Sequence, residues 1–316
     1  MIEISVVIPV YRAEKALLEV YAQLVPAMEH HASSFEVIFV EDGGGDGSWA
    51  IIAELAARDS RIRGIRMRRN YGQHNALLCG IRAARYPITM TMDDDLQHPV
   101  SEIPLMIAAL DDSCDVVYGA PKAETHGILR DLASRLTKIA LQGAMGADTA
   151  RSVSAFRVFR TSLRDGFRDY RSPSVSIDVL LTWGTSRFRA IRVRHEARTI
   201  GVSGYTMGKL VRHAFNLMTG FSTLPLQVAS FIGFVFFLFG TLLLFYVLGN
   251  YLVRGSAVPG FAFLASIIAM FSGAQMFAMG IFGEYLARIH FRTMDRPPYV
   301  VRDIAGASAD DGASRV

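Results

Sequence analysis

The chain has 316 residues, 51% of them hydrophobic, with a formal net charge of +4 and a mean hydropathy of +0.27. That hydropathy is high for a purely soluble protein, but the apolar excess is concentrated after Leu224, so it is local. Basic residues are dense over 187–212 and 288–302, which favours an anionic surface or a phosphate-bearing partner. We expect no nucleic-acid partner.

The two cysteines, Cys79 and Cys114, have no Cys or His neighbours at metal-ligand spacing. This spacing argues against a zinc site and predicts reduced core thiols in a cytosolic domain. Residues 1–12 enter a strand pattern at once, so we expect no cleavable signal peptide.

Apolar runs and helical spacings alternate up to residue 195. Strands alternating with helices imply right-handed βαβ units, so the sequence predicts an α/β fold with a mainly parallel sheet. The predicted strands are 4–10, 35–40, 62–67, 88–92, 115–118, 154–160 and 187–195. The predicted helices are 14–30, 49–58, 75–85, 103–110, 127–146 and 175–183.

Three aspartates, Asp93, Asp94 and Asp95, stand where the strand 88–92 should end. In open α/β sheets, ligands bind at the carboxyl ends of the strands. Clustered carboxylates repel one another unless a cation compensates them, and hard oxygens suit Mg²⁺ or Mn²⁺, which also bind substrate phosphates. We therefore predict a metal and diphosphate site at Asp93 and Asp95. For so short a motif taken alone, a solvated acidic turn is the commoner meaning.

A glycine-rich turn at 41–48 follows the strand 35–40 and precedes a helix, an arrangement that lets backbone approach an anionic ligand. The dinucleotide fingerprint G-x-G-x-x-G is missing after the first strand, which argues against an NAD-dependent dehydrogenase. Asp42 is predicted to accept a hydrogen bond from a base or a ribose. Ser48 is predicted to cap the helix that follows.

Charged side chains recur on three later elements. The predicted helix 127–146 carries Arg130 on a basic face that is either solvated or turned to a phosphate. The strand 187–195 carries four arginines, which we expect at the solvated rim of the sheet. Asp178 could act as a base, but an ordinary helix carboxylate is the simpler interpretation.

The chain after residue 200 has membrane character. A joint at 201–205 leads to a helix at 207–221, whose apolar stripe and basic residues fit either a membrane-interface helix or a core helix with a wet face. Two apolar stretches follow at 226–253 and 261–282, and about 20 residues suffice to cross a bilayer.

Basic residues crowd both outer flanks of these stretches, so the positive-inside rule predicts a two-helix hairpin in the inner membrane with both termini cytoplasmic. The expected division is a cytosolic domain at 1–200, a joint and interfacial amphipathic helix at 201–224, two transmembrane helices at 225–286, and a basic juxtamembrane segment and tail at 287–316.

Four motifs, taken in order, resemble those of family 2 glycosyltransferases with the GT-A fold. They are P-V-Y at 9–11, E-D-G-x-x-D at 41–46, R-N-Y-G-Q-H-x-A at 69–76 and D-x-D-L-Q-x-P at 93–99. Three later motifs narrow the resemblance to the polyprenyl-phosphate branch, and the motifs are most similar to those of undecaprenyl-phosphate aminoarabinose transferases. These are R-x-x-G-x-S-x-Y at 198–205, S-x-x-P-L at 222–226 and G-E-Y-x-x-R at 283–288.

The resemblance implies roles for the matching residues. Asp93 and Asp95 are implied to be catalytic and to hold Mg²⁺ or Mn²⁺ with the diphosphate, supported by Gln97, and Arg198 is implied to act at the acceptor. The implied nucleotide-binding residues are Pro9, Tyr11, Asp42 and Asp94, and the candidate acceptor-binding residues are Lys122, Arg130, Arg198, Ser203 and Tyr205.

The chain departs from the family pattern at a few positions. Arg12 and Ala13 replace an Asn-Glu pair, which removes one nucleotide contact unless Glu14 supplies it. Glu41 replaces an aspartate, and Gly204 replaces a lysine. These differences bear on the donor more than on the reaction class.

The function implied by the resemblance is metal-dependent, inverting transfer of a sugar from a UDP-sugar to undecaprenyl (polyprenyl) phosphate at the cytoplasmic membrane face. The product would be a lipid-linked sugar for cell-envelope glycan modification, and relatives suggest a homo-oligomer, a tetramer, assembled through the hairpin. A processive polysaccharide synthase is a weaker alternative, because its Q-x-x-R-W motif is missing and more spans would be expected. A non-catalytic membrane scaffold with a degenerate transferase domain is kept open by Ala13 and Gly204.

Overall fold

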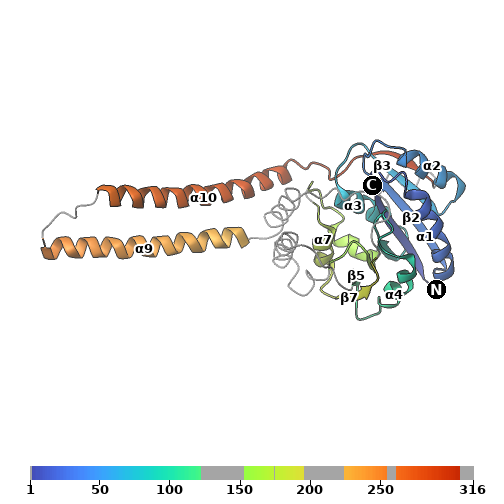
Figure 1. The fold of residues 1–316 in the computed structure, drawn as a ribbon, viewed down its shortest axis with the longest axis horizontal. Coiled ribbons are helices and arrows are strands. Elements are labelled where there is room, and N and C mark those ends of the chain that lie inside the picture. Colours follow the sequence, from blue (N-terminus) through green and yellow to red (C-terminus); the bar gives the residue numbers. More distant parts are fainter. Residues whose placement is uncertain (1, 122–152, 174, 196–223, 255–260, 307–316) are drawn as a thin grey trace.

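A computed structural model describes residues 2–121, 153–173, 175–195, 224–254 and 261–306. An α/β domain contains the N-terminal part of the chain, and two long antiparallel helices project together from one side of it (Figure 1). The α/β class predicted from the alternating pattern is confirmed.

An eight-stranded sheet forms the centre of the described domain, in the order β7-β5-β6-β4-β1-β2-β3-β8. Its middle strands β4, β1, β2 and β3 are parallel, whereas β6 runs antiparallel between β4 and β5. The sheet is therefore mixed but mainly parallel at its centre. The strands are β1 Glu3–Val10, β2 Ser34–Glu41, β3 Ile62–Met67, β4 Ile88–Thr91, β5 Val116–Pro121, β6 Arg157–Arg160, β7 Phe188–Val193 and β8 Val301–Ala305.

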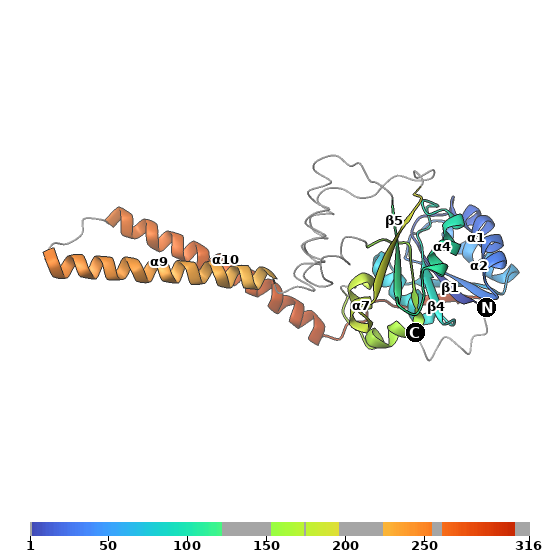
Figure 2. The same cartoon turned by 90° about the horizontal axis from the view of Figure 1, so that it is seen from below.

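Helices cover both faces of this sheet (Figure 2). Val6 and Ile8 of β1 face one apolar core with α1, α2 and α4, while Val7 faces a second core with α3 and α7. Burial on both faces explains why β1 is a continuous apolar run. The helices are α1 Leu17–His31, α2 Ser48–Arg58, α3 Gln73–Ala83, α4 Ile103–Ala108, α7 Ile177–Gly184, α9 Leu224–Arg254 and α10 Phe261–Thr293.

The chain returns to the domain after α10 and adds β8 to the free edge of β3, in antiparallel orientation. The backbone N–H of Arg68 donates to the carbonyl of Val300 at 2.9 Å. Tyr299 lies 7% exposed in the core that contains α3. Sequence analysis does not predict this strand, because V-R-D-I-A shows no clear alternation and follows a basic flank. Residues Val301–Ala305 therefore belong to the sheet and not to a separate tail.

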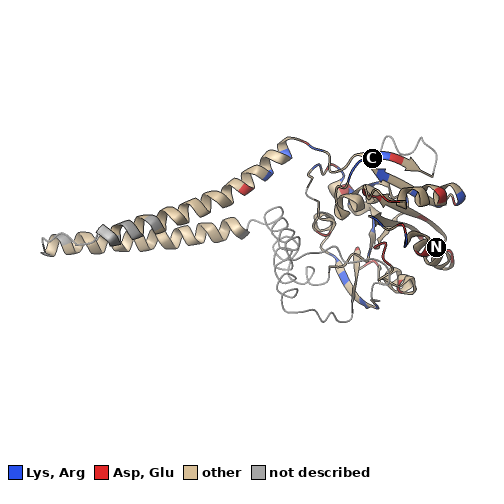
Figure 3. Ribbon diagram, turned by 45° about the horizontal axis from the view of Figure 1, so that its top comes forward, with Lys and Arg blue, Asp and Glu red and all other residues tan. Residues whose placement is uncertain are grey.

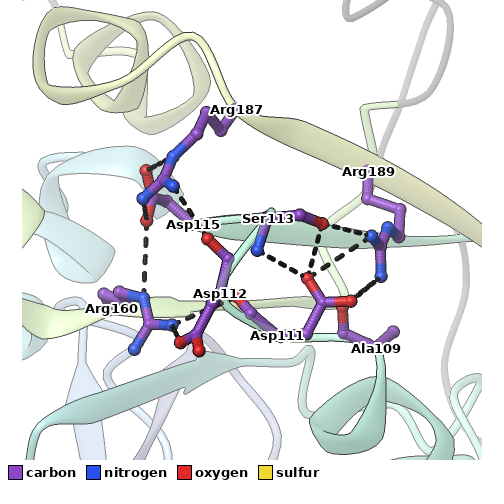
Figure 4. A network of polar contacts seen from close by, with 8 residues as sticks. All are labelled: Ala109, Asp111, Asp112, Ser113, Asp115, Arg160, Arg187 and Arg189. Atoms are coloured by element: carbon purple, nitrogen blue, oxygen red, sulfur yellow. Dashed lines mark hydrogen bonds and ion pairs between the residues drawn. The ribbon is translucent and has the colours of Figure 1, made fainter.

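Arg187, directly before β7, and Arg189 within it lie at the opposite edge of the sheet, as expected, and acidic partners hold both (Figure 4). Arg187 Nη2 lies 2.6 Å from Asp115 Oδ1, and Arg189 Nη1 lies 2.8 Å from Asp111 Oδ2. Arg160 of β6 approaches the same Asp115 carboxylate at 3.4 Å. These pairs tie β7 to the turn before β5.

We expect Asp115→Asn to lower the melting temperature by about 2–4 °C at neutral pH, because a carboxylate that accepts from Arg187 and Thr185 is lost. These hydrogen bonds hold the pKa of Asp115 below its ordinary value. The stabilisation that the Asp115 carboxylate gives the folded state is therefore fully present above the ordinary aspartate pKa. It is lost as the pH falls from that value through the lower pKa of the folded state. Melting curves between neutral and acidic pH check this, and equal acid sensitivity in both proteins would contradict it.

The two long helices α9 and α10 pack together, with the rings of Phe236 and Phe271 centred 5.4 Å apart. Within the described residues, one stretch, Pro225–Asn250, is long and apolar enough to cross a bilayer, and 0% of its most apolar window is buried. The apolar stretch 261–282 lies in α10, and its crossing of a membrane remains a prediction.

Candidate functional site

The carboxyl ends of three neighbouring parallel strands bring the predicted nucleotide-binding residues to one edge of the sheet. β1 lies between β2 and β4, so the loops that follow these strands are adjacent. Pro9 is buried in β1, and the backbone N–H of Tyr11 donates to Asp94 Oδ2 at 3.3 Å across 83 residues of sequence. Asp42 follows β2 at the same edge.

The acidic turn, which we define as Asp93, Asp94 and Asp95, begins the loop after β4. Gln73 Nε2 donates to Asp93 Oδ1 at 2.7 Å, and the backbone N–H of Gln97 donates to Asp95 Oδ1 at 3.1 Å. Asp95 is only 7% exposed. Together with the Tyr11 N–H that binds Asp94, neighbouring backbone and side chains therefore orient all three carboxylates.

The carboxylates of the acidic turn repel one another. Burial raises the pKa of Asp94 to about 7, and repulsion from Asp93 and Asp95 adds a smaller increase. A divalent cation would relieve this repulsion. The described residues contain no group of three or more His, Cys, Asp or Glu side chains arranged to hold a metal ion. Because Mg²⁺ at phosphate sites takes one or two carboxylates plus substrate oxygens, the acidic turn fits a metal shared with a diphosphate.

Asp42 is buried, with 3% of its surface exposed. Its Oδ1 accepts the backbone N–H of Tyr71 at 2.7 Å, and its Oδ2 accepts that of Gly72 at 2.8 Å. Burial raises the pKa of Asp42 to about 6, although these two hydrogen bonds oppose the increase. Asp42 thus holds the loop between β3 and α3 against the site, and its contact with a base or a ribose remains a prediction.

The glycine-rich turn after β2 packs closely on that same loop. Gly43 has φ +65°, and a Cβ there would lie 2.5 Å from backbone atoms of Arg69 and Asn70. A side chain at this position would therefore be strained by its backbone conformation and would also clash. The motifs at 41–46 and 69–76, far apart in sequence, are in contact through Gly43.

Ser48 does not cap α2 as predicted, because the helix already begins at Ser48 and the residue before it, Gly47, occupies the cap position. The Ser48 hydroxyl instead accepts the backbone N–H of Ala13 at 3.2 Å and donates to Asp46 at 2.9 Å. Glu14 Oε2 accepts the N–H of Gly47 at 3.1 Å. These contacts tie the loop after β1 to the glycine-rich turn.

Asp178 is part of a buried structural pair. Arg157 Nη1 donates to Asp178 Oδ1 at 2.5 Å, and the Tyr118 hydroxyl donates to the same oxygen at 3.1 Å. Arg157 is 2% exposed and Asp178 is 5% exposed. This agrees with the simpler interpretation of Asp178 as a helix carboxylate engaged in the fold.

Gln73 is the residue at the acidic turn that sequence analysis did not single out. Its place in R-N-Y-G-Q-H was a signal, but nothing in the sequence shows that the start of α3 faces the loop after β4. The predicted acceptor residues Lys122, Arg130, Arg198, Ser203 and Tyr205, and the predicted interfacial helix at 207–221, lie outside the described residues.

Comparisons with known proteins agree with these motifs. The sequence profile described as "Glycosyl transferase family 2" matches residues 5–167. An undecaprenyl-phosphate 4-deoxy-4-formamido-L-arabinose transferase of Proteus mirabilis is 32% identical over 96% of this chain and 94% of its own. The enzyme of the same name from Shewanella sediminis is 32% identical over 98% and 95%.

Solved structures show the same fold. Mannosyl-3-phosphoglycerate synthase from Rubrobacter xylanophilus aligns with a TM-score of 0.52 at 14% identity, over 68% of this chain and 71% of that protein. Glucosyl-3-phosphoglycerate synthase from Mycobacterium tuberculosis, in complex with Mn²⁺, UDP and glucosyl-3-phosphoglycerate, aligns with a TM-score of 0.50 at 15% identity, over 69% and 78%.

The resemblance drawn from the motifs is thus confirmed by a profile over half of the chain and by relatives matched along nearly all of it. The fold is the α/β arrangement shared with GT-A enzymes, and the acidic turn lies at the carboxyl end of its strand β4. The chain belongs to glycosyl transferase family 2 and is a glycosyltransferase.

Proposed function

We propose that the protein transfers a sugar from a UDP-sugar to undecaprenyl phosphate at the cytoplasmic face of the inner membrane. The observation that carries this proposal is the acidic turn, which lies beside the loops after β1 and β2 on a chain that also holds an exposed apolar helix. The names of the two relatives support undecaprenyl phosphate as the acceptor. The UDP complex of the M. tuberculosis enzyme supports a UDP-sugar as the donor.

Asp93 and Asp95 would hold Mg²⁺ or Mn²⁺, which when bound would offset the charge that develops on the leaving diphosphate. Gln73 orients Asp93 through its 2.7 Å hydrogen bond, and the Gln97 backbone orients Asp95. The acceptor phosphate is already an anion and needs little deprotonation. Catalysis can therefore rest on positioning and charge compensation, without a side chain acting as a base.

The position of β8 supports a hairpin that crosses the membrane twice. β8 pairs with β3, so segments before α9 and after α10 belong to one sheet. If α9 crosses the bilayer, the chain must cross it a second time before β8 can rejoin that sheet. The helix that lies between α9 and β8 in the chain is α10. This constraint follows from the pairing of β8 with β3 and does not depend on the basic residues that flank the helices.

We expect a reporter inserted between residues 254 and 260 to be periplasmic and a reporter fused after Val316 to be cytoplasmic. Paired alkaline phosphatase and fluorescent protein fusions measure this. A periplasmic score for the Val316 fusion would reverse the hairpin and separate the domain from cytosolic UDP-sugars. A cytoplasmic score at both sites would mean that neither helix crosses.

Arg198 is proposed to bind the acceptor phosphate, with Lys122, Arg130, Ser203 and Tyr205 in the same region. A guanidinium binds a phosphate through two parallel hydrogen bonds, whereas lysine keeps the charge but loses that geometry. We expect Arg198→Ala to lose transfer about tenfold or more with UDP affinity unchanged, and Arg198→Lys to recover part of it. Transfer assays and calorimetric titration with UDP check this; a matching loss of UDP affinity would contradict it.

A panel of UDP-sugars tests the proposal and its rivals. Because of the relatives' names, UDP-4-deoxy-4-formamido-L-arabinose is the first donor to try. UDP release that requires undecaprenyl phosphate is the expected result. Release of UDP with growth of a polymer would favour a processive synthase, and no UDP binding or release with any donor would favour a non-catalytic scaffold.

A further inference from the structure

A cavity of about 460 Å³ lies where α10 rejoins the α/β domain; we call it the junction cavity. One wall is formed by the loop between β3 and α3, including Arg69 and Tyr71. The other is formed by Phe291 near the end of α10 and by Arg296 and the prolines that follow. Figure 1 shows the chain that follows α10 entering the domain on the side of α3 and β3.

Asn75 lines the junction cavity with a buried acceptor that lacks a partner. Its Nδ2 donates to the carbonyls of Tyr71 at 2.5 Å and Pro173 at 3.3 Å, which fixes the orientation of the amide. Its Oδ1 then has no hydrogen-bond partner among the described residues, although Asn75 is only 7% exposed. Because Oδ1 has almost no accessible surface, it is closed to a ligand in the cavity, and the fixed amide serves only to brace this wall.

Two exposed guanidinium groups, those of Arg69 and Arg296, bring positive charge to the cavity. Neighbouring arginines at this end of α10 are paired: Arg171 with Asp295 at 3.0 Å, and Arg288 with Glu284 at 2.8 Å. Arg69 stacks on the ring of Tyr71 at 4.5 Å. Within the part of the chain that the structure describes, neither Arg69 nor Arg296 pairs with a carboxylate. Figure 3 shows the basic residues of α10 gathered at the end that meets the domain.

The remaining walls are apolar. Phe291 is 47% exposed, and Pro297 and Pro298 continue the surface from it. The cavity therefore combines two guanidinium groups and an aromatic surface at the domain end of a helix that packs on the candidate membrane span. A phosphate diester with an apolar tail complements both features.

We propose that the junction cavity binds the phosphate of an anionic phospholipid, for which phosphatidylglycerol is the probe. This inference rests on the proposed function only in placing α10 at the membrane. Arg69 and Arg296 would hold the phosphate. The bound lipid would brace the loop whose Tyr71 and Gly72 contact Asp42 and whose neighbour Gln73 contacts Asp93.

The test uses the full-length protein in phosphatidylcholine nanodiscs containing phosphatidylglycerol, with retained lipid counted by native mass spectrometry. We expect Arg296→Gln to lower phosphatidylglycerol retention about tenfold and Arg296→Lys to lower it less. Arg168→Gln is the matched control, because Arg168 is exposed, pairs with Asp165 and does not line the cavity. Equal retention by wild type and Arg296→Gln, or equal loss in Arg168→Gln, would overturn the proposal.

One further arm identifies the ligand. Undecaprenyl phosphate at matched concentration should not displace phosphatidylglycerol; displacement would assign the cavity to the acceptor and overturn the lipid proposal. Transfer measured in detergent without phospholipid separates failure of the proposed function from failure of this inference.

Discussion

Asp95→Ala is expected to lower sugar transfer by about a hundredfold or more while leaving the fold intact. Removing one electrostatic contact to developing charge typically costs about 10²–10³ in rate. Asp95 is 7% exposed and oriented by the Gln97 backbone, so its carboxylate cannot readily be replaced by water or a neighbour. Initial rates of transfer at saturating Mg²⁺ or Mn²⁺ measure the effect.

Asp112→Ala is the matched control, because Asp112 also lies on a turn but its side chain is fully exposed, at 110% of the reference area. It should transfer at the wild-type rate. Melting curves of both variants verify folding. Near-normal transfer by Asp95→Ala, or by the wild type after chelation of divalent cations, would contradict the metal role of the acidic turn.

Asp178→Ala is expected to destabilise the domain by about 3–5 kcal/mol, because it leaves the Arg157 guanidinium buried and unpaired. The loss of the oxygen that accepts from the Tyr118 hydroxyl adds to the cost. Chemical denaturation of the purified protein measures the change. Replacing both partners, as Arg157→Met with Asp178→Leu, should recover much of the stability, because no charge is left unpaired.

The same pair of variants separates a structural role from a catalytic one. If Asp178 acts only in the fold, the double variant recovers transfer together with stability. A double variant that is stable but transfers at less than a hundredth of the wild-type rate would mean that Asp178 contributes to the chemistry.

The central strands could be predicted because they are buried on both faces. Val6, Val7 and Ile8 form a continuous apolar run, and each side chain enters one of two cores. The acidic turn was predictable for a related reason, since charges that directly follow a buried strand must lie at the edge of the sheet. β8 was not predictable, because an edge strand with two exposed charges is specified by its pairing with β3 and not by its own pattern.

The sequence could predict which residues lie at the candidate site, but not which atoms they contact there. Asp42 is at the edge of the sheet, as expected, yet both of its oxygens accept from the backbone of the next loop. Gln73 could not be singled out, because its contact with Asp93 depends on where α3 begins relative to β4. The Ser48 prediction failed by one residue, since helix boundaries are the least certain feature of a sequence pattern.

The most direct test of the central claim is the mass of the lipid product. Purified full-length protein in nanodiscs is incubated with undecaprenyl phosphate, a divalent cation and UDP-4-deoxy-4-formamido-L-arabinose, then with other UDP-sugars. Our account predicts that the lipid gains one sugar residue with at least one donor, that UDP is released in equal amount, and that chelation of the cation stops both. Unchanged lipid with every donor, or a sugar-bearing lipid that still forms after chelation, would contradict it.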